Sequence, residues 1–328
     1  MRDSSDIVRS CHTQPHIQIR MEKGDRRMAD AGVGSHPALS IGLAVYNGQQ
    51  FVARALDSLL AQSFPNYELI ISDDASTDRS NEICQSYVAR DARIRYIRQP
   101  SNLGMYRNFD FLVNESRGSF YMWAAQDDEW DPDWCKVLME NMTEDAIISF
   151  GHVKLLGPAR SILQLYKRPQ FSKNEIRRTF QLFFQDFPWS IGSSPIYGIC
   201  RRQSILDCPI SKIEKLSRDS TDSLWVFTVG QRGHILTDDR VYHYKHAGYP
   251  KSNRPRILQR IREQVVVLHQ VRMLTCFPLL ARRWWLRPVF ALLTPVRYLI
   301  RVCVSNIGLI RKVIARAQGS PLPDRSSR

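Results

Sequence analysis

The chain has 328 residues, which is enough for one large domain or two ordinary ones. Its hydrophobic content of 43% and its mixed charge are those of a globular protein and exclude a largely disordered one. The seven cysteines form no CxxC pair and show no metal-ligand spacing, which argues against a disulfide framework and a structural zinc site and favours a reducing compartment. The net charge of +14 is concentrated in residues 251–328, which contain 16 lysines and arginines but only two acids.

The first 37 residues lack the apolar core of a signal peptide and show no sustained hydrophobic periodicity. We therefore expect residues 1–37 to be a polar, disordered leader. A single folded domain is expected at 38–250, followed by a basic helical region at 251–328.

Strand-like and helix-like patterns alternate from residue 39 onward. Short apolar runs predict buried strands at 39–45, 67–72, 93–98 and 119–123. Apolar residues at helical spacing predict helices at 52–60, from about 78 to 88, and from about 105 to 114. Short connections between such elements favour right-handed crossovers, so the chain is predicted to have an α/β fold with a mostly parallel sheet covered by helices on both faces.

Polar residues follow three of these strands. Asn47 follows the first, Asp73 and Asp74 end the second, and Asp127 and Asp128 follow the fourth. Ligands of open parallel sheets bind at the carboxyl ends of the strands, so these side chains are candidates for one common site. The adjacent carboxylates would repel each other and lose hydration unless a cation lies between them; the alternative is an acidic turn into the next helix.

Two nucleotide-binding motifs are missing from the sequence. The turn after the first strand has no G-x-G-x-x-G pattern, and the chain has no Walker A sequence. A dinucleotide site of the Rossmann type is therefore not predicted.

Several motifs resemble, in the same order, those of the family 2 glycosyltransferases, which are inverting enzymes with the GT-A fold. The resemblance covers roughly residues 38–250. It is carried by SIGLAVYNG at 40–48, SLLAQSF at 58–64, ELIISDDASTD at 68–78, NLGMYRNF at 102–109 and QDDEWDP at 126–132. Many relatives have an acid two residues before Asp127, where this chain has Ala125, so two carboxylates remain.

The resemblance implies a role for each acid near the donor sugar. Asp128 would hold a divalent metal ion, Mg²⁺ or Mn²⁺, and Asp127 would reach the ribose or the waters of the metal. Such hard cations bind carboxylates and phosphate oxygens, and they neutralise a departing diphosphate. Asp74 would accept hydrogen bonds from the nucleobase.

Two loops would form the rest of the nucleotide-sugar pocket. By the resemblance, they contribute Val45, Tyr46 and Asn47 after the first strand, and Asn102, Gly104 and Arg107 around the start of the third helix. Gly104 would allow a close backbone approach. Arg107 would face phosphate, or else it is a solvated helix residue.

An inverting transfer also needs a base that takes the proton of the acceptor hydroxyl, opposite the metal. The stretch SRDSTDSLWVFTVGQRG at 217–233 resembles the family element in which an acid precedes an apolar helix and a glycine. The resemblance therefore implies Asp222 as the base, with Asp219 as the alternative, although either acid could instead cap the helix. The stretch PIYGICRR at 195–202 resembles the strand that closes the acceptor side.

Apolar residues of the C-terminal region are interleaved with arginine. No stretch of about 18 apolar residues is free of charge, so a membrane-spanning helix is not expected. A basic region with tryptophans is typical of amphipathic helices on an anionic membrane surface; the alternative is helices docked on the domain with a solvated basic face. No nucleic-acid-binding motif accompanies the charge, so nucleic acid is not expected as a partner.

Together with the resemblance, these patterns predict a metal-dependent inverting glycosyltransferase of the hexosyltransferase class. It would transfer a sugar from a nucleotide sugar to a hydroxyl of a glycan or lipid-linked acceptor in surface polysaccharide assembly. We expect it to be cytoplasmic and peripheral on the inner face of the cytoplasmic membrane. The alternative, suggested by Ala125, is a membrane-associated protein that binds a nucleotide sugar or glycan without turnover. A nucleotidyltransferase would need a glycine- and arginine-rich phosphate loop after the first strand, which the sequence lacks.

Overall fold

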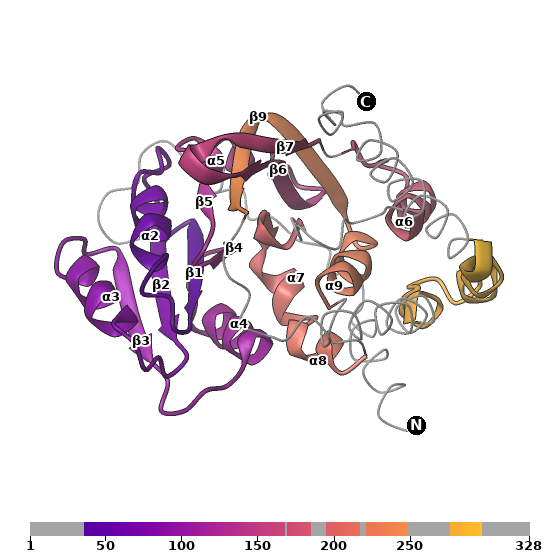
Figure 1. Ribbon diagram of the computed structural model, residues 1–328. Helices are drawn as coiled ribbons and strands as arrows, with labels where there is room; N and C mark the ends of the chain where they lie inside the picture. The colour runs from indigo at the N-terminus through magenta and orange to yellow at the C-terminus, as the bar shows by residue number, and fades with distance from the viewer. Residues whose placement is uncertain (1–35, 168, 185–194, 217–220, 248–275, 297–328) are drawn as a thin grey trace, which may run out of the picture.

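The computed structural model describes residues 36–167, 169–184, 195–216, 221–247 and 276–296 (Figure 1). The predicted leader, apart from its last two residues, and the predicted boundary at residue 250 lie outside the described residues.

The first part of the domain alternates strand and helix as predicted. Its elements are β1 (Leu39–Val45), α2 (Val52–Leu60), β2 (Tyr67–Asp73), α3 (Ser80–Val88), β3 (Ile94–Arg98), α4 (Met105–Glu115) and β4 (Phe120–Ala125). The apolar stripe of α2 is buried at Val52, Ala55, Leu56 and Leu59. Each predicted strand and helix of this part is therefore confirmed, with small shifts at its ends.

The second part is less regular. The sequence predicts β8 and α9 among its elements, and the alternative interpretation of the acidic turn predicts the helix that follows it, α5. Its strands are β5 (Glu129–Trp130), β6 (Ala146–Leu156), β7 (Ile162–Tyr166), β8 (Ile199–Arg201) and β9 (His234–His246). Its helices are α5 (Trp134–Glu140), α6 (Glu175–Phe184), α7 (Arg202–Leu206), α8 (Ile210–Glu214) and α9 (Thr221–Gly230), with short 3₁₀ turns at Pro158–Arg160 and Pro195–Tyr197.

All of these strands join one sheet in the order β3-β2-β1-β4-β8-β6-β9-β5, and β7 pairs with β6 outside this path. The strands β3, β2, β1 and β4 run parallel, as predicted. By contrast, β8 is antiparallel to both β4 and β6, and β5 is antiparallel to β9. The sheet is thus parallel in its first half and mixed in its second half.

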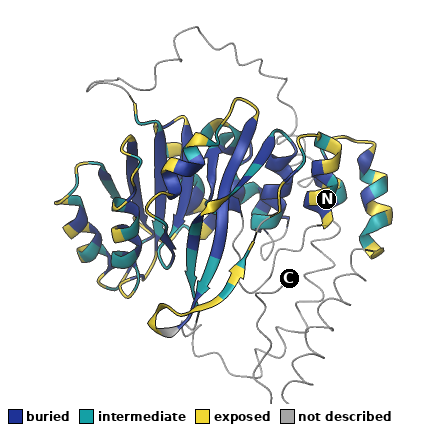
Figure 2. Cartoon of the chain, turned by 90° about the horizontal axis from the view of Figure 1, so that it is seen from above, coloured by how far each residue is buried: buried dark blue, intermediate teal, exposed yellow. Residues whose placement is uncertain are grey.

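Helices cover both faces of the sheet. Neighbouring residues of a strand point to opposite faces, so the side chains of one strand contact both helix layers. In β4, Phe120, Met122 and Ala124 pack on the side of α2. Tyr121 and Trp123 pack on the other side, against α4 and α9. Figure 2 shows most of the strands as a deeply buried layer, with exposed residues on the outer helix faces, on the loops and on the edge strand β7.

The described part of the basic C-terminal region, residues 276–296, is helical at 276–280 and 286–296. Phe290 stacks on Phe183 of α6, with 4.6 Å between ring centroids, and Phe277 meets Phe227 of α9 edge-on at 4.7 Å. These contacts match the docked arrangement given above as the alternative to a membrane-bound segment. Among the described residues, no helix is both long and apolar enough to cross a membrane.

Candidate functional site

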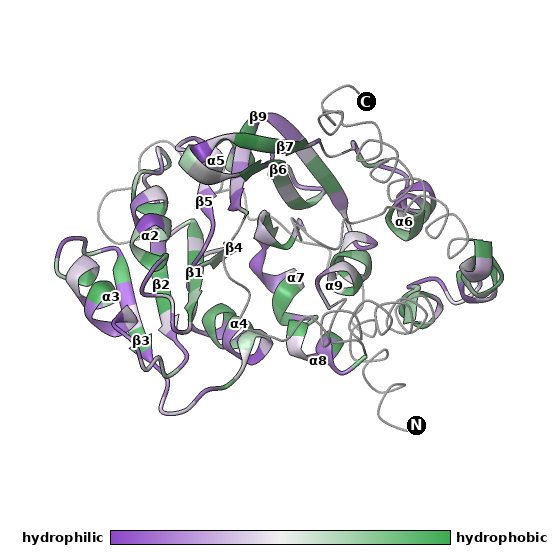
Figure 3. Ribbon diagram, viewed as in Figure 1, coloured by the Kyte–Doolittle hydropathy of each residue, from purple (hydrophilic) through white to green (hydrophobic). Residues whose placement is uncertain are grey.

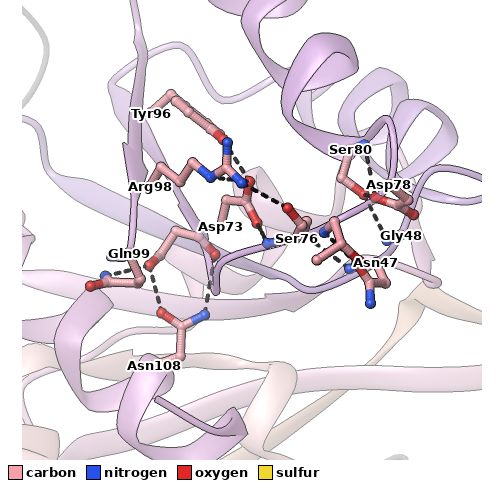
Figure 4. A network of polar contacts seen from close by, with 12 residues as sticks. Asn47, Gly48, Asp73, Ser76, Asp78, Ser80, Tyr96, Arg98, Gln99 and Asn108 are labelled. Atoms are coloured by element: carbon pink, nitrogen blue, oxygen red, sulfur yellow. Dashed lines mark hydrogen bonds and ion pairs between the residues drawn. The ribbon is translucent and has the colours of Figure 1, made fainter. Parts of the chain in front are cut away.

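The loops after β1 and β2 are tied together by hydrogen bonds at the carboxyl ends of the two strands (Figure 4). The backbone N–H of Thr77 donates to Asn47 Oδ1 at 2.8 Å, and the N–H of Asn47 donates to Ser76 Oγ at 3.0 Å. The N–H of Gly48 donates to Ser80 Oγ at 2.7 Å. Asn47 has a φ of 48°, a left-handed conformation that asparagine tolerates better than most residues. Its side-chain oxygen therefore shapes the predicted nucleotide loop.

Gln126 fixes the end of β1 to the turn that carries the two carboxylates. The N–H of Tyr46 donates to Gln126 Oε1 at 2.9 Å, and Gln126 Nε2 donates to the carbonyl of Tyr46 at 3.0 Å. The carbonyl of Val45 accepts from the N–H of Asp74 at 2.8 Å. The backbone of Val45 and Tyr46, predicted to line the nucleotide pocket, is thus held in place by neighbouring loops. Sequence reasoning missed Gln126, and its position next to Asp127 was the only signal available.

Asp74 is buried and holds the loop that leads into α4. Its two carboxylate oxygens accept from the backbone N–H groups of Leu103, at 2.6 Å, and Gly104, at 3.0 Å. Asn102 Oδ1 also accepts from the N–H of Gly104, at 3.0 Å. Gly104 has a φ of 85° with open space where a Cβ would lie, so the backbone conformation explains this glycine. The structure thus brings Asp74, Asn102 and Gly104 together, while Arg107 is exposed on α4.

Asp128 is buried and lies between two basic side chains of β9. Its Oδ2 accepts from Lys245 Nζ at 3.0 Å and lies 2.9 Å from His243 Nε2. Burial alone would raise the pKa of Asp128, but the nearby Lys245 and His243 outweigh burial and hold the pKa far below its usual range. Burial lowers the pKa of His243, whose ring stacks on Trp130. The charge that balances Asp128 near neutral pH therefore comes from Lys245.

Asp127, the other member of the pair, is half-buried. Burial and the adjacent negative charge of Asp128 raise its pKa, and Lys245 opposes this rise. Asp127 is therefore protonated more readily than Asp128, although both residues lie in the same turn.

The described residues offer few ligands to a divalent metal ion besides Asp127 and Asp128. Within the described ranges, no cluster of three or more histidines, cysteines, aspartates and glutamates could hold a metal. The ligand predicted for the metal, Asp128, already has a lysine ammonium at one oxygen. At the position where Asp128 was predicted to hold Mg²⁺ or Mn²⁺, the structure thus places the ammonium group of Lys245.

Asp222, the predicted base, lies in the first turn of α9 on the same side of the sheet as α4. The hydroxyl of Tyr106 donates to its Oδ1 at 3.2 Å. Burial raises the pKa of Asp222, while the hydrogen bond from Tyr106 and the charge of Lys245 lower it in part. The alternative base, Asp219, lies outside the described residues.

Tyr197 is close enough to Asp222, Asp127 and Asp128 for the charges of all three to act on its hydroxyl. Burial raises its pKa well above the usual value, and the charges of Asp222, Asp128 and Asp127 add to this effect. Lys245 Nζ lies 4.9 Å from the centre of its ring. The structure therefore gathers Asp222 and the Asp127–Asp128 pair around one tyrosine and one lysine. Sequence reasoning did not assign roles to Tyr106, Tyr197, His243 or Lys245.

Comparison with known proteins identifies the family of this chain. The model of the family "Glycosyl transferase family 2" matches residues 40–207. EpsH of Bacillus subtilis (strain 168), named as a glycosyltransferase, is 34% identical over 110 residues, which is 33% of this chain and 31% of EpsH. WcaA of Escherichia coli (strain K12), named as a glycosyl transferase of colanic acid biosynthesis, is 29% identical over 164 residues, covering 48% of this chain and 58% of WcaA. The matches thus span less than two thirds of either relative.

A solved structure supports the same fold. The mannosyltransferase PcManGT from Pyrobaculum calidifontis, in complex with GDP-Man and Mn²⁺, superposes with a TM-score of 0.52 at 14% identity. The superposition covers 87% of this chain and 81% of that one. Identity this low informs on the fold, which is GT-A, and not on ligands.

Proposed function

The chain belongs to glycosyl transferase family 2, and from this premise we propose that it transfers a sugar from a nucleotide sugar to a hydroxyl of an acceptor, with inversion at the anomeric carbon. The observation that carries the proposal is the convergence of Asp222 with Asp127 and Asp128 around Tyr197. Asp222 lies in α9, and Asp127 and Asp128 lie in the turn between β4 and β5. An acid on one element close to two acids on another suits a displacement that needs a base on one side and a stabilised leaving group on the other.

In the proposed reaction, the acceptor oxygen attacks the anomeric carbon as the bond to the diphosphate breaks. The proton of the acceptor hydroxyl passes to the carboxylate of Asp222, and the bonding electrons leave with the diphosphate. A base works best when its pKa is close to the working pH, so burial of Asp222 suits it to this task. The hydroxyl of Tyr106 orients the carboxylate.

Nucleotide binding is assigned to the loops around Tyr46, Asn47 and Asp74, together with Asn102 and Gly104. Their mutual hydrogen bonds support this assignment because a preformed loop loses little entropy on binding. Arg107 is assigned to the phosphates because its exposed side chain follows Gly104 in the first turn of α4. Asp127 is assigned to the ribose.

Screening nucleotide sugars against the purified protein tests the proposal. Each donor is incubated with and without Mg²⁺ or Mn²⁺, and both donor hydrolysis and thermal stabilisation are measured. We expect at least one donor to raise the melting temperature and to be hydrolysed slowly. If no nucleotide or nucleotide sugar stabilises the protein under any condition, the proposal is wrong.

We further propose that the acceptor is a glycan or a lipid-linked glycan in surface polysaccharide assembly. The similarity to WcaA, named for colanic acid biosynthesis, supports this assignment. It would be tested by transfer of label from the active donor to lipid-linked oligosaccharides.

We also propose that the protein is peripheral on the anionic inner face of the cytoplasmic membrane. Although one face of residues 276–296 packs on the domain, Trp284 is 76% exposed and Leu292 is 78% exposed, and Trp285 is also exposed. Exposed tryptophans beside arginines are typical of segments that bind anionic lipid surfaces.

Point substitutions test membrane binding without removing Phe277 and Phe290 from the core. Replacing Trp284, Trp285 and Leu292 by serine should abolish sedimentation with phosphatidylglycerol vesicles. The matched control replaces Ile162 and Leu163, which are exposed on β7, by serine and should leave sedimentation unchanged. Sedimentation of the triple variant at the level of the unsubstituted protein would contradict membrane binding through these residues.

A further inference from the structure

We infer that the ammonium group of Lys245 is the fixed cation of the donor site and binds the diphosphate of the nucleotide sugar in place of a divalent metal ion. This inference rests on the proposed function, since it names the group that would bind the donor's phosphates. It concerns the positive charge that any departing diphosphate requires.

The position of Lys245 follows from strand pairing. β5 comes directly after Asp128 and pairs with β9, with Trp130 opposite His243 and Glu129 opposite Tyr244. Residues two apart on a strand share a face, so His243 and Lys245 both point to the side of Asp128. The contact between Lys245 and Asp128 is therefore built into the sheet and does not depend on a flexible loop.

Lys245 has hydrogen-bonding capacity left for a ligand. An ammonium group has three N–H donors, and one of them is used by Asp128 Oδ2 at 3.0 Å. The ring of Tyr197 lies 4.9 Å away and offers its face to the cation. The side chain of Lys245 is 17% exposed, so a ligand from solvent can reach it, whereas the side chain of Asp128 is only 3% exposed.

The same contacts argue against a divalent ion at this place. Mg²⁺ and Mn²⁺ bind through oxygen ligands, and the charge of a bound ion would lie next to the ammonium that already shares Asp128 Oδ2. The position two residues before Asp127 is Ala125, so no third carboxylate balances the extra positive charge. The ammonium of Lys245 thus already neutralises part of the negative charge that a divalent ion would need.

In the reaction, Lys245 takes no part in proton transfer. The bond between the anomeric carbon and the diphosphate breaks, and its electrons remain on the departing phosphate oxygen, whose negative charge the ammonium stabilises. The proton of the acceptor goes to Asp222, so no further reactant is needed.

Nucleoside diphosphate binding in the presence of EDTA tests the inference. Calorimetry with UDP, GDP, ADP, CDP and dTDP is carried out on the unsubstituted protein, on Lys245→Met and on Lys245→Arg. We expect one diphosphate to bind the unsubstituted protein in EDTA. Affinity should fall by roughly 10- to 100-fold in Lys245→Met, the loss typical of a charge-assisted hydrogen bond, and should be partly retained in Lys245→Arg.

Lys154→Met is the matched control. Lys154 lies on β6 opposite Tyr244 of β9, and its ammonium lies over the ring of Tyr242, 3.5 Å from the ring centre. Lys154→Met removes the same charge from β6, the neighbour of β9, but on the face of the sheet opposite to Lys245. Its affinity for the nucleoside diphosphate should therefore be unchanged. Thermal unfolding of every variant shows which of them are folded, and Lys245→Arg keeps the test valid if Lys245→Met does not fold.

The outcomes separate this inference from the proposed function. Binding in EDTA that is weakened by Lys245→Met, less so by Lys245→Arg and not by Lys154→Met supports both. Binding that requires Mg²⁺ or Mn²⁺, or binding in EDTA that is indifferent to Lys245→Met, overturns the role of Lys245 and leaves the proposed function standing. No binding of any diphosphate, with or without metal, overturns both.

Discussion

The two halves of the sheet use their polar residues differently. In β1 to β4, polar side chains at the strand ends mostly bond to backbone groups of the neighbouring loops, as Asn47, Asp74 and Gln126 do. In the second half, β9 and α9 direct Lys245 and Asp222 toward the centre of the site. The first half thus provides hydrogen-bonded loops, and the second provides the charged side chains proposed for the reaction. A polar residue at a strand end is therefore evidence for a shaped loop as much as for a ligand contact.

Asp222→Asn is expected to have the largest effect, because it removes the charge that the second half contributes to proton transfer. The rate of sugar transfer should fall by roughly 10²- to 10⁴-fold, the usual contribution of a general base, while diphosphate affinity measured by calorimetry is unchanged. Asp238→Asn, which removes a partner of Arg240 in β9, is the control and should keep full activity. Full transfer by Asp222→Asn would exclude Asp222 as the base. A protein that binds a nucleotide but never transfers would favour the non-catalytic alternative.

Asp128→Asn should come next, because it breaks the ionic contact between the two halves. Removing one partner of a buried ion pair leaves Lys245 without its counter-charge, so the free energy of unfolding should fall by about 3 kcal/mol. Urea denaturation measures this change. Asp91→Asn breaks the more exposed pair with Arg93 in the first half and should cost less than about 1 kcal/mol. Equal losses of unfolding free energy in the two variants would show that the Lys245–Asp128 contact stabilises the protein no more than an exposed ion pair does.

Tyr106→Phe should have a smaller effect, visible mainly in the pH dependence. Transfer requires ionised Asp222, so activity should fall as the pH falls through its pKa, which burial places above the ordinary range of aspartate. Removing the hydroxyl that stabilises the ionised form raises this pKa further, and the acid limb of the rate profile should move to higher pH.

Tyr96→Phe is the control for this shift. Its hydroxyl donates to Asp73 Oδ2 at 2.7 Å in the first half, away from the base. The acid limb should stay in place in this variant. An unmoved limb in Tyr106→Phe would show that Tyr106 does not act on the base.

Gln126→Ala should have the smallest effect on stability, because its hydrogen bonds with Tyr46 lie near solvent. We expect a loss of about 1 kcal/mol in the free energy of unfolding and a few-fold weaker diphosphate binding. Gln181→Ala removes two comparable bonds to backbone groups, those of Ser172 and Gln170, far from the site. The control should match the stability loss and leave binding unchanged. Weakened binding in both variants would contradict a specific role for Gln126.

Most of the first half of the fold could be predicted because β1, β2 and β4 are buried on both faces and read as apolar runs. Such runs stand out in β1 and β2, where nearly every residue is buried. β9 has no such signal, since its sequence HILTDDRVYHYKH is mostly polar. Figure 3 shows this strand as predominantly hydrophilic beside the hydrophobic β6. Its pairing with β6 and β5, and not its composition, makes it a strand.

The candidate site was predictable to the same extent. Asp127, Asp128 and Asp222 are marked by their motifs, and the structure brings them together. The engagement of Asp74 with the backbone of Leu103 and Gly104 could not be predicted, because it depends on where a loop turns. Lys245 likewise required the register of β5 on β9, which no local pattern encodes.

The contact between Lys245 and Asp128 also has a consequence for biosynthesis. The two residues are 117 positions apart, so the carboxylate leaves the ribosome well before its counter-charge. During translation, β1 to β4 can pair while Asp128 still lacks its counter-charge. Lys245 supplies that charge only when β9 has emerged. Contacts of such long sequence separation form late and slowly. We therefore expect the nascent chain to acquire a competent donor site in one late step, when β9 joins the sheet.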